Sequence, residues 1–179
     1  MDTNAQGKQR TYLRSVVAAD RVEFLTLMQM SQSLHHPWIS PPLTDLSFNA
    51  YLARTQRDDH EGMLVCRAAD NAIVGVINLN TIVRGSFLSA SLGYYVGAPF
   101  AGQGLMREGL DLVKEFAFEK LGLHRLEANI QPENHRSIAL VKQSGFELEG
   151  LCRDYLFIDG RWRDHQRWAA VHERTRLHP

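Results

Sequence analysis

Apolar residues recur at intervals of three and four positions along one segment of the chain: Met106, Leu110, Val113, Ala117 and Leu121. This spacing brings the side chains to one face of a helix, so it predicts an amphipathic helix with a buried stripe. Gly122 follows directly and is typical of the residue that ends a helix. A second helix is expected from Asn134, a good N-cap residue, to Ser144, where Gly145 and Phe146 end it.

Other segments alternate between apolar and polar residues or run continuously apolar, which is typical of strands. Strands are expected over residues 11–16, 63–68, 73–83, a segment ending near Val96, 125–130, 148–158 and 162–171, and further helices over 20–33 and 45–57. Asp70-Asn71 and Asp159-Gly160 are turn pairs that close two hairpins, and the proline-rich segment 35–42 is a loop. The expected fold class is α/β (α+β), a central mixed sheet with helices on both faces.

Length and charge limit the class of protein. The 179 residues suffice for one domain with a sizeable core, expected over 11–179 after a polar, flexible segment 1–10. Lys plus Arg and Asp plus Glu each number 20, so neither nucleic acid nor a membrane is expected as a partner. No apolar run reaches the roughly 18 residues that span a bilayer, and residues 1–10 lack the apolar core of a signal peptide. A cytoplasmic protein is expected.

Cysteine and histidine positions show no metal-binding pattern. Cys66 and Cys152 have neither the spacing of a disulfide framework nor that of a metal site, and they are interpreted as small buried residues. The eight histidines include no His-x-x-x-His pair, and His124 and His135 are expected to be solvated near helix ends. We therefore expect no metal.

A glycine-rich turn joins the strand ending near Val96 to the long amphipathic helix. The glycines of Gly102-Gln103-Gly104 let the backbone approach a ligand, and the first N–H groups of the following helix lack internal partners. This arrangement suits an anion such as pyrophosphate. The turn has neither the Gly-Lys-Ser/Thr ending of a Walker A motif nor the third glycine of a dinucleotide fingerprint. Alone, it is equally consistent with a plain strand-to-helix connection.

The order of elements after this turn favours a ligand-binding turn over a plain strand-to-helix connection. A strand, Asn134, a helix and Gly145-Phe146 follow in sequence, and this order resembles the Gcn5-related N-acetyltransferases, the GNAT superfamily. The loop pattern of that family, Gln/Arg-x-x-Gly-x-Gly/Ala, falls on residues 99–104, with Pro99 at its first position.

One branch of the family matches the end of the chain. Residues 145–150, 154–156 and 159–165 are similar to the RimJ/RimL-type ribosomal-protein N-terminal acetyltransferases. The resemblance rests on motifs over residues 92–170 and on element order alone over residues 11–91.

The resemblance implies a single GNAT-like domain with a mostly antiparallel, twisted sheet, and acetyl-CoA as co-substrate. In the family, backbone N–H groups at the helix start hold the pyrophosphate, while the splayed end of the preceding strand and an Asn contact the pantetheine arm. The cofactor-binding residues carried over are Tyr95, Val96, Gly102, Gln103, Gly104, Leu105, Met106 and Asn134. Pro99 removes one N–H, but the contacts are mainly made by other backbone groups.

Glu127 and Ser137 are the catalytic residues that the resemblance implies. Some members place a general base at the position of Glu127. An ordinary Glu has a pKa of about 4.3 against about 8 for an α-amino group, so it would act through water or in a dry cleft. The alternative is a strand Glu paired with an Arg. The RimL-type base position holds Leu156, which leaves Asp154 as the nearest other carboxylate. Ser137 would stabilise the leaving thiolate where many members use a Tyr at the position of Val141; the alternative is an ordinary first-turn Ser.

The acceptor is expected to contact Trp38, on a loop, and Asp154. The preferred acceptor is a protein N-terminal α-amino group, as in the ribosomal-protein branch. With a pKa near 8, such a group is roughly 10% neutral at pH 7, whereas a lysine with a pKa of about 10.4 is far less so. Two alternatives stay open: an acetyltransferase for small amines, polyamines or antibiotics, and a coenzyme-A-binding sensor domain without turnover. The sequence also leaves the oligomeric state open.

Overall fold

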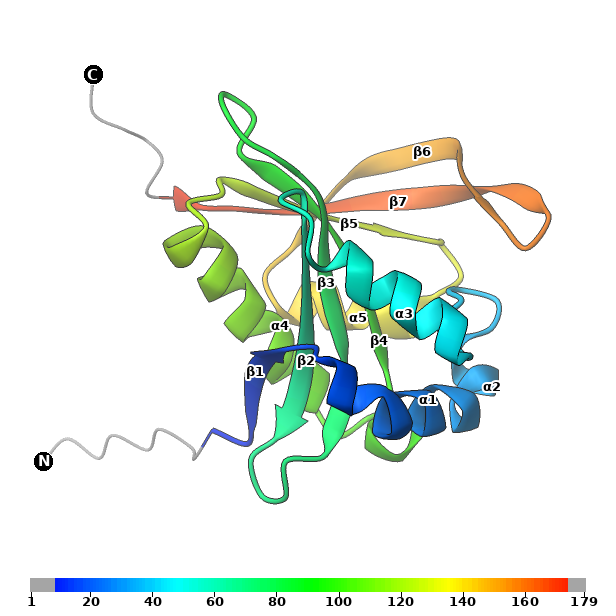
Figure 1. Ribbon diagram of the computed structural model, residues 1–179. Coiled ribbons are helices and arrows are strands. Elements are labelled where there is room, and N and C mark those ends of the chain that lie inside the picture. Colours follow the sequence, from blue (N-terminus) through cyan, green and yellow to red (C-terminus); the bar gives the residue numbers. More distant parts are fainter. Residues whose placement is uncertain (1–8, 174–179) are drawn as a thin grey trace, which may run out of the picture.

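A computed structural model of the chain describes residues 9–173, which fold around a seven-stranded sheet of order β1-β2-β3-β4-β5-β7-β6 (Figure 1). The strands are β1 Thr11–Ser15, β2 His60–Arg67, β3 Ile73–Val83, β4 Ser89–Val96, β5 Arg125–Ile130, β6 Glu147–Ile158 and β7 Arg161–Val171. All neighbouring strands are antiparallel except β4 and β5, which are parallel. The mixed, mostly antiparallel sheet expected from the sequence is confirmed.

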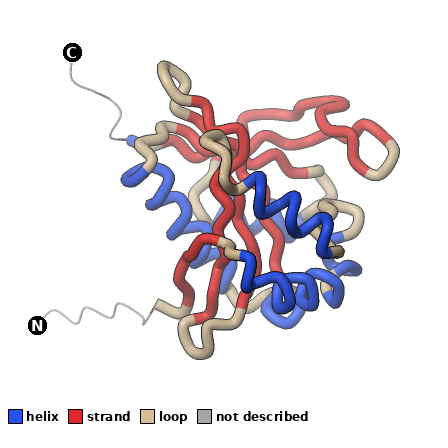
Figure 2. Tube along the Cα trace, viewed as in Figure 1, coloured by secondary structure: helices blue, strands red, loops and turns tan. Residues whose placement is uncertain are grey.

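Helices cover both faces of the sheet (Figures 1 and 2). They are α1 Arg21–Met30, α2 Gln32–His35, α3 Asp45–Arg54, α4 Leu105–Glu115 and α5 His135–Gln143, with short helical turns at Ala18–Asp20, Ala98–Phe100 and Phe116–Lys120. Residues of α1 and α3 share one apolar core with one face of the sheet, and residues of α4 and α5 share a second core with the other face. Burial on both faces explains why β2 and β3 are almost continuously apolar.

Three expected helices end earlier than the sequence pattern indicates, and the one expected over 45–57 ends at Arg54. The helix expected over 20–33 is divided at Ser31, whose hydroxyl donates to the Leu27 carbonyl at 2.6 Å and accepts from the Ala98 N–H at 2.8 Å. A hydroxyl that bonds back to the preceding turn disturbs the helix, and its second bond ties the break to the segment after β4. The helix expected to reach Leu121 changes at Phe116 into a π-type turn.

The expected turns are confirmed. At the end of α5, Gly145 has φ +78° and the Phe146 N–H donates to the Val141 carbonyl at 3.0 Å, as in a Schellman motif. Between β6 and β7, Asp159 and Gly160 have φ values of +52° and +75°. Positive φ at both central residues is the geometry of a tight hairpin turn.

The sheet opens between β4 and β5. The two strands pair only from Ser89 opposite Arg125 to Leu92 opposite Ala128, although each continues further. Along β5 the side chains alternate, so Leu126, Ala128 and Ile130 enter the core shared with α4 and α5. Glu127 and Asn129 therefore point to the opposite face, and a splayed gap separates the ends of two central strands.

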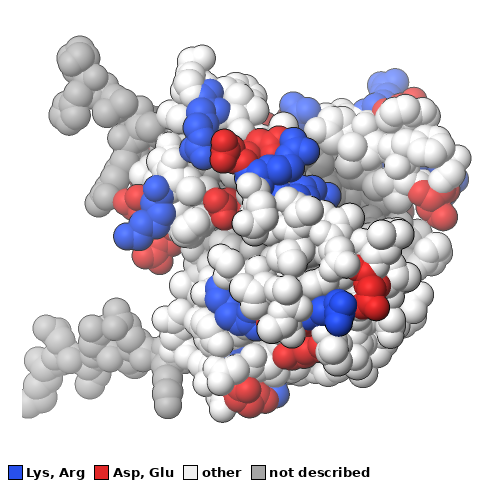
Figure 3. Space-filling view, in the orientation of Figure 1, with Lys and Arg blue, Asp and Glu red and all other residues white. Residues whose placement is uncertain are grey.

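Charges are spread over the surface without a patch of one sign on the face drawn in Figure 3, where acidic and basic side chains lie next to each other. This agrees with the formal net charge of zero. Within residues 9–173, no helix is long and apolar enough to cross a bilayer.

Candidate active site

Two glycines shape the turn before α4. Gly102 has φ +74° and Gly104 has φ +77°, the left-handed conformation that glycine adopts without strain. In the described part of the chain, nothing accepts a hydrogen bond from the N–H groups of residues 102–107. Uncommitted donors at the positive end of a helix dipole form a site for an anion.

Arg10 lies directly against this turn. Its Nη1 donates to the Gln103 carbonyl at 3.2 Å, and its Nε donates to Glu108 Oε1, in the first turn of α4, at 2.6 Å. A Cβ added at Gly104 would lie 3.3 Å from Arg10 Nη2, so the guanidinium borders the glycine. Arg10 is thus tied to the domain rather than to the polar segment 1–10, of which residues 1–8 lie outside the described residues.

The start of α5 faces the splayed end of β4. Asn134 caps the helix, its Oδ1 accepting from the Ser137 N–H at 3.2 Å. The Ser137 hydroxyl lies 2.5 Å from the hydroxyl of Tyr94 on β4. Burial raises the pKa of Tyr94 to about 12, so this phenol stays protonated and can donate. Val141, at the position where many family members carry a Tyr, is fully buried.

Sequence reasoning missed Tyr94 as a site residue. It lies 43 positions from Ser137, and a Tyr within an apolar strand is typical of the core. Only the fold, which crosses β4 over the start of α5, brings the two hydroxyls together.

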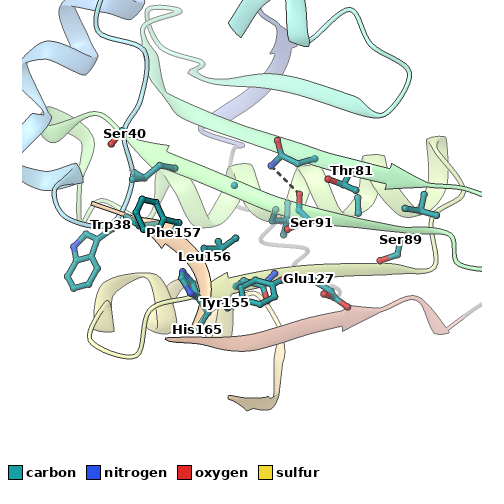
Figure 4. Close-up of a pocket in the computed structure, with 18 of the residues that line it drawn as sticks. Trp38, Ser40, Thr81, Ser89, Ser91, Glu127, Tyr155, Leu156, Phe157 and His165 are labelled. Atoms are coloured by element: carbon teal, nitrogen blue, oxygen red, sulfur yellow. Dashed lines mark hydrogen bonds between the residues drawn. The ribbon is translucent and has the colours of Figure 1, made fainter. Parts of the chain in front are cut away.

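A cleft of about 730 Å³ opens on the other face of the sheet (Figure 4). Its floor is formed by β4 and β5, and its walls are the loop after α2, the β3–β4 connection and the β6–β7 hairpin. The lining is mostly apolar or small, and its amide, carboxyl and imidazole side chains on the strands are Asn80, Glu127, Asn129 and His165. Its residues are Trp38, Ile39, Ser40, Asn80, Thr81, Val83, Phe87, Ser89, Ala90, Ser91, Leu92, Gly93, Glu127, Asn129, Tyr155, Leu156, Phe157, Ile158, Asp159 and His165.

Glu127 is held between two arginines. Its Oε1 accepts from Arg125 Nε at 2.7 Å, and its Oε2 lies 3.6 Å from Arg167 Nε. Arg125 in turn pairs with Glu149 on the edge strand β6. Glu127, which is predicted as a base, therefore lines the cleft. It also has the arginine partners expected of the alternative, a strand Glu held in an ion pair.

The other predicted residues divide between the two faces. Trp38 and Leu156 line the cleft, whereas Asp154 does not; it is an exposed residue at a bulge in β6, and its N–H donates to Asp164 Oδ1 at 2.9 Å. The side chain of Tyr95 is buried in the core with α1 and α3. The Val96 carbonyl, expected to pair with a pantetheine arm, accepts from His35 Nε2 at 2.8 Å.

Together, the sheet splayed between parallel strands, the donor-rich glycine turn and the capped helix define an acyltransferase-like fold, and the chain belongs to the family of acetyltransferase (GNAT) domains, which matches residues 10–147. The probable N-acetyltransferase YjcK of Bacillus subtilis (strain 168) is 35% identical over 121 residues, which cover 68% of this chain and 67% of that protein.

Two further proteins match the RimJ/RimL-type branch. The ribosomal protein uS5-alanine N-acetyltransferase of Escherichia coli (strain K12) is 45% identical over 96 residues, 54% of this chain, and the match spans half (50%) of that relative's length. The structure of Mycobacterium smegmatis RimJ in complex with CoA-disulfide superposes with a TM-score of 0.84 at 27% identity, covering 93% of this chain and 84% of that chain. The resemblance to this branch is therefore confirmed.

Proposed function

We propose that this protein transfers an acetyl group from acetyl-CoA to the α-amino group of a protein N-terminus. The observation that carries the choice of acceptor is the charge of the cleft. Both carboxylates that line it have arginine partners: Glu127 with Arg125 and Arg167, and Asp159 with Arg163 at 3.7 Å. A polyamine or aminoglycoside carries several positive charges and needs unpaired carboxylates, whereas a peptide N-terminus carries one and offers side chains to apolar walls.

The residues around the glycine turn fit acetyl-CoA. The uncommitted N–H groups of residues 102–107 and the guanidinium of Arg10 would hold its pyrophosphate. The unpaired edge of β4 near Tyr95 and Val96 would accompany the pantetheine arm toward Asn134. When bound, the coenzyme supplies an acetyl thioester, whose carbonyl is the electrophile.

The chain's own groups would handle the protons of the reaction. On one side of the splayed sheet, the Ser137 hydroxyl can accept a hydrogen bond from the Tyr94 hydroxyl and donate its own hydrogen to the sulfur of the leaving thiolate. On the other side, the acceptor ammonium must lose a proton before its nitrogen can attack. Glu127 stays a prediction for that role, acting through water, and Asp154 stays the alternative, although only Glu127 lines the cleft.

An acceptor screen tests this function. The full chain is mixed with acetyl-CoA and, separately, with short peptides bearing free N-termini, with spermidine, with an aminoglycoside and with no acceptor, and release of the free thiol is followed. Peptides are expected to give the highest kcat/KM, and the same peptides with a blocked N-terminus none. Turnover with spermidine or the aminoglycoside alone would show that the acceptor is a small amine and not a protein N-terminus. Binding of acetyl-CoA without thiol release with any acceptor would show that the protein is a sensor domain without turnover.

A further inference from the structure

His165 is a buried titratable residue in the cleft that the function proposed above does not use. It lies on β7, is only 2% exposed, and lines the cleft together with Glu127 and Tyr155 (Figure 4). In the register of β5 and β7, Asn129 pairs with Arg167, so His165, two residues along β7, points to the same face as a diagonal neighbour of Asn129.

One hydrogen bond fixes the tautomer of this ring. His165 Nδ1 lies 2.9 Å from the Arg163 carbonyl oxygen, which can only accept, so Nδ1 carries the hydrogen. In the neutral ring the lone pair is then on Nε2. Within residues 9–173 no group bonds to Nε2, and this atom is not sealed from solvent. Nε2 is therefore available to a ligand in the cleft.

The surroundings of the ring favour its neutral form. Tyr155 of β6 packs against it with ring centroids 5.7 Å apart, and Cys152 faces it across the same pair of strands. Asp164 is its chain neighbour, and Arg125, Arg167 and Glu127 are charged groups on the same sheet face. Burial lowers the pKa of His165, and the Arg163 carbonyl and Asp164 oppose this effect only in part.

The competing carboxylate is Glu127. Both of its oxygens already have arginine partners, Arg125 Nε at 2.7 Å and Arg167 Nε at 3.6 Å. By contrast, among the described residues His165 Nε2 has no partner and is not sealed from solvent, whereas the Oδ1 of the neighbouring Asn129 is buried without a partner and stays out of reach of a ligand in the cleft.

We infer that His165 Nε2, in place of Glu127, takes the proton from the ammonium group of the acceptor; this inference rests on the proposed function. The imidazole gains one proton and the acceptor becomes a neutral amine. The amine nitrogen forms a bond to the carbonyl carbon of the thioester while the carbon–sulfur bond breaks and its electron pair stays on sulfur. The nitrogen loses its second proton to solvent as the amide forms. The thiolate takes a proton from the Ser137 hydroxyl, which solvent reprotonates, and the imidazolium returns its proton to solvent.

His165→Asn tests this step, because the amide N–H of Asn can keep the bond to the Arg163 carbonyl while Nε2 is removed. At pH 7, kcat/KM for an N-terminal peptide is expected to fall about 10²-fold. The deficit should narrow toward pH 9, where the acceptor amine is already neutral. The rise in melting temperature caused by acetyl-CoA should match that of the wild type. Nitrogen-15 NMR of the imidazole of the wild-type protein should show Nε2 without a hydrogen at pH 7, whatever the activity.

Glu127→Gln is the matched comparison, since it removes the charge but not the ring. It should lower kcat/KM less than His165→Asn does. The fall of kcat/KM toward acidic pH should stay that of the wild type. A loss in His165→Asn that is equal at every pH, or a hydrogen on Nε2 at pH 7, would show a structural role and overturn the inference while leaving the acetyltransferase function intact. If the wild type itself releases no thiol with any peptide, the proposed function fails and the inference falls with it.

Discussion

Gly104 combines a left-handed backbone with a position at the mouth of the anion site. A Val there would place its Cβ 3.3 Å from Arg10 Nη2 and cover the N–H groups that start α4. We predict that Gly104→Val abolishes the stabilisation by acetyl-CoA, which for the wild type should reach about 2.7 kcal/mol at 100 times the dissociation constant. Thermal unfolding with and without the ligand measures this, and the far-UV spectrum should stay that of the wild type.

Gly160→Val is the control for backbone strain in this experiment. Gly160 has a similar φ of +75°, lies in the turn between β6 and β7 and has open space around it. This variant should lose stability for the same backbone reason but keep the full response to acetyl-CoA. A Gly104→Val protein that still responds would contradict the assignment of the glycine turn.

Ser137 and Tyr94 form a hydroxyl pair at the splayed end of β4. If Ser137 stabilises the leaving thiolate, Ser137→Ala should lower kcat by about 10²-fold or less with little change in acetyl-CoA affinity. Tyr94→Phe should shift kcat in the same direction by a smaller factor, because Ser137 keeps its hydroxyl and loses only the partner that orients it. Steady-state kinetics with a peptide acceptor check both. An unchanged kcat in Ser137→Ala would leave this residue as a first-turn Ser only.

Single residues show how far sequence reasoning reaches. Asn134 was recognised as an N-cap because its chemistry and spacing are local to α5, and the structure confirms the cap. Arg10 and Tyr94 were missed because their partners lie 98 and 43 positions away. No local pattern encodes a contact that exists only after the sheet has assembled.

At the scale of elements, the start of α5 has two separable tasks. Asn134 accepts from the Ser137 N–H, and its amide donors are predicted to contact the coenzyme arm. Asn134→Ala should cost about 1 kcal/mol of stability through loss of the cap. Asn134→Asp keeps the capping acceptor and should restore stability, but it lacks the amide donors, so both variants should raise the KM for acetyl-CoA. Urea unfolding and kinetics on both proteins separate the tasks. A normal KM in Asn134→Asp would limit this residue to capping.

Element boundaries were predictable where the signal is a turn and failed where it is a tertiary contact. Gly145 and Asp159-Gly160 end elements through their own backbone conformations, and these ends were predicted correctly. The break at Ser31 depends on the Ala98 N–H, 67 positions away, so a helical pattern that continues past it gave no warning. For Glu127 the sequence left open a base or a strand Glu paired with an Arg, and the second partner, Arg167, is brought to it only by the pairing of β5 with β7.

At the scale of the whole molecule, the sheet separates the two halves of the reaction. The glycine turn, α5 and the Tyr94–Ser137 pair lie with the core of α4 and α5, whereas Glu127, Asn129 and His165 lie in the cleft on the opposite face. Tyr94 and Asn129, one from each set, both lie beyond the last paired residues of β4 and β5, where the gap opens. The order of these elements is predictable from the sequence, whereas the gap depends on β4 and β5 pairing only over residues 89–92 and 125–128.

Buried histidines should make the stability of the whole fold fall in mild acid. Burial lowers the pKa of His35, His60 and His165, and the positive charge of Arg54 lowers that of His60 further. Because their folded-state pKa values lie below the unfolded value of about 6.5, the unfolded chain binds more protons between the two values. The stabilisation is therefore complete above about pH 6.5 and is lost as the pH falls below it, by at most about 1.4 kcal/mol per pH unit for each ring. Urea unfolding from pH 7.5 to pH 4.5 measures this slope.

His60→Gln isolates one contribution to that slope. His60 is 3% exposed and its Nε2 is buried without a partner among the described residues, so burial opposes its protonation, and Asp59 and Asn78 offset this only in part. The variant should unfold with a shallower dependence on pH below 6.5, because Gln does not titrate, even if its stability at pH 7.5 is reduced by altered packing against Tyr51. His135→Gln makes the same change at an exposed position in the first turn of α5 and is the control. A wild-type protein equally stable at pH 7.5 and pH 5.5 would show that the buried rings accept protons in the folded state without cost.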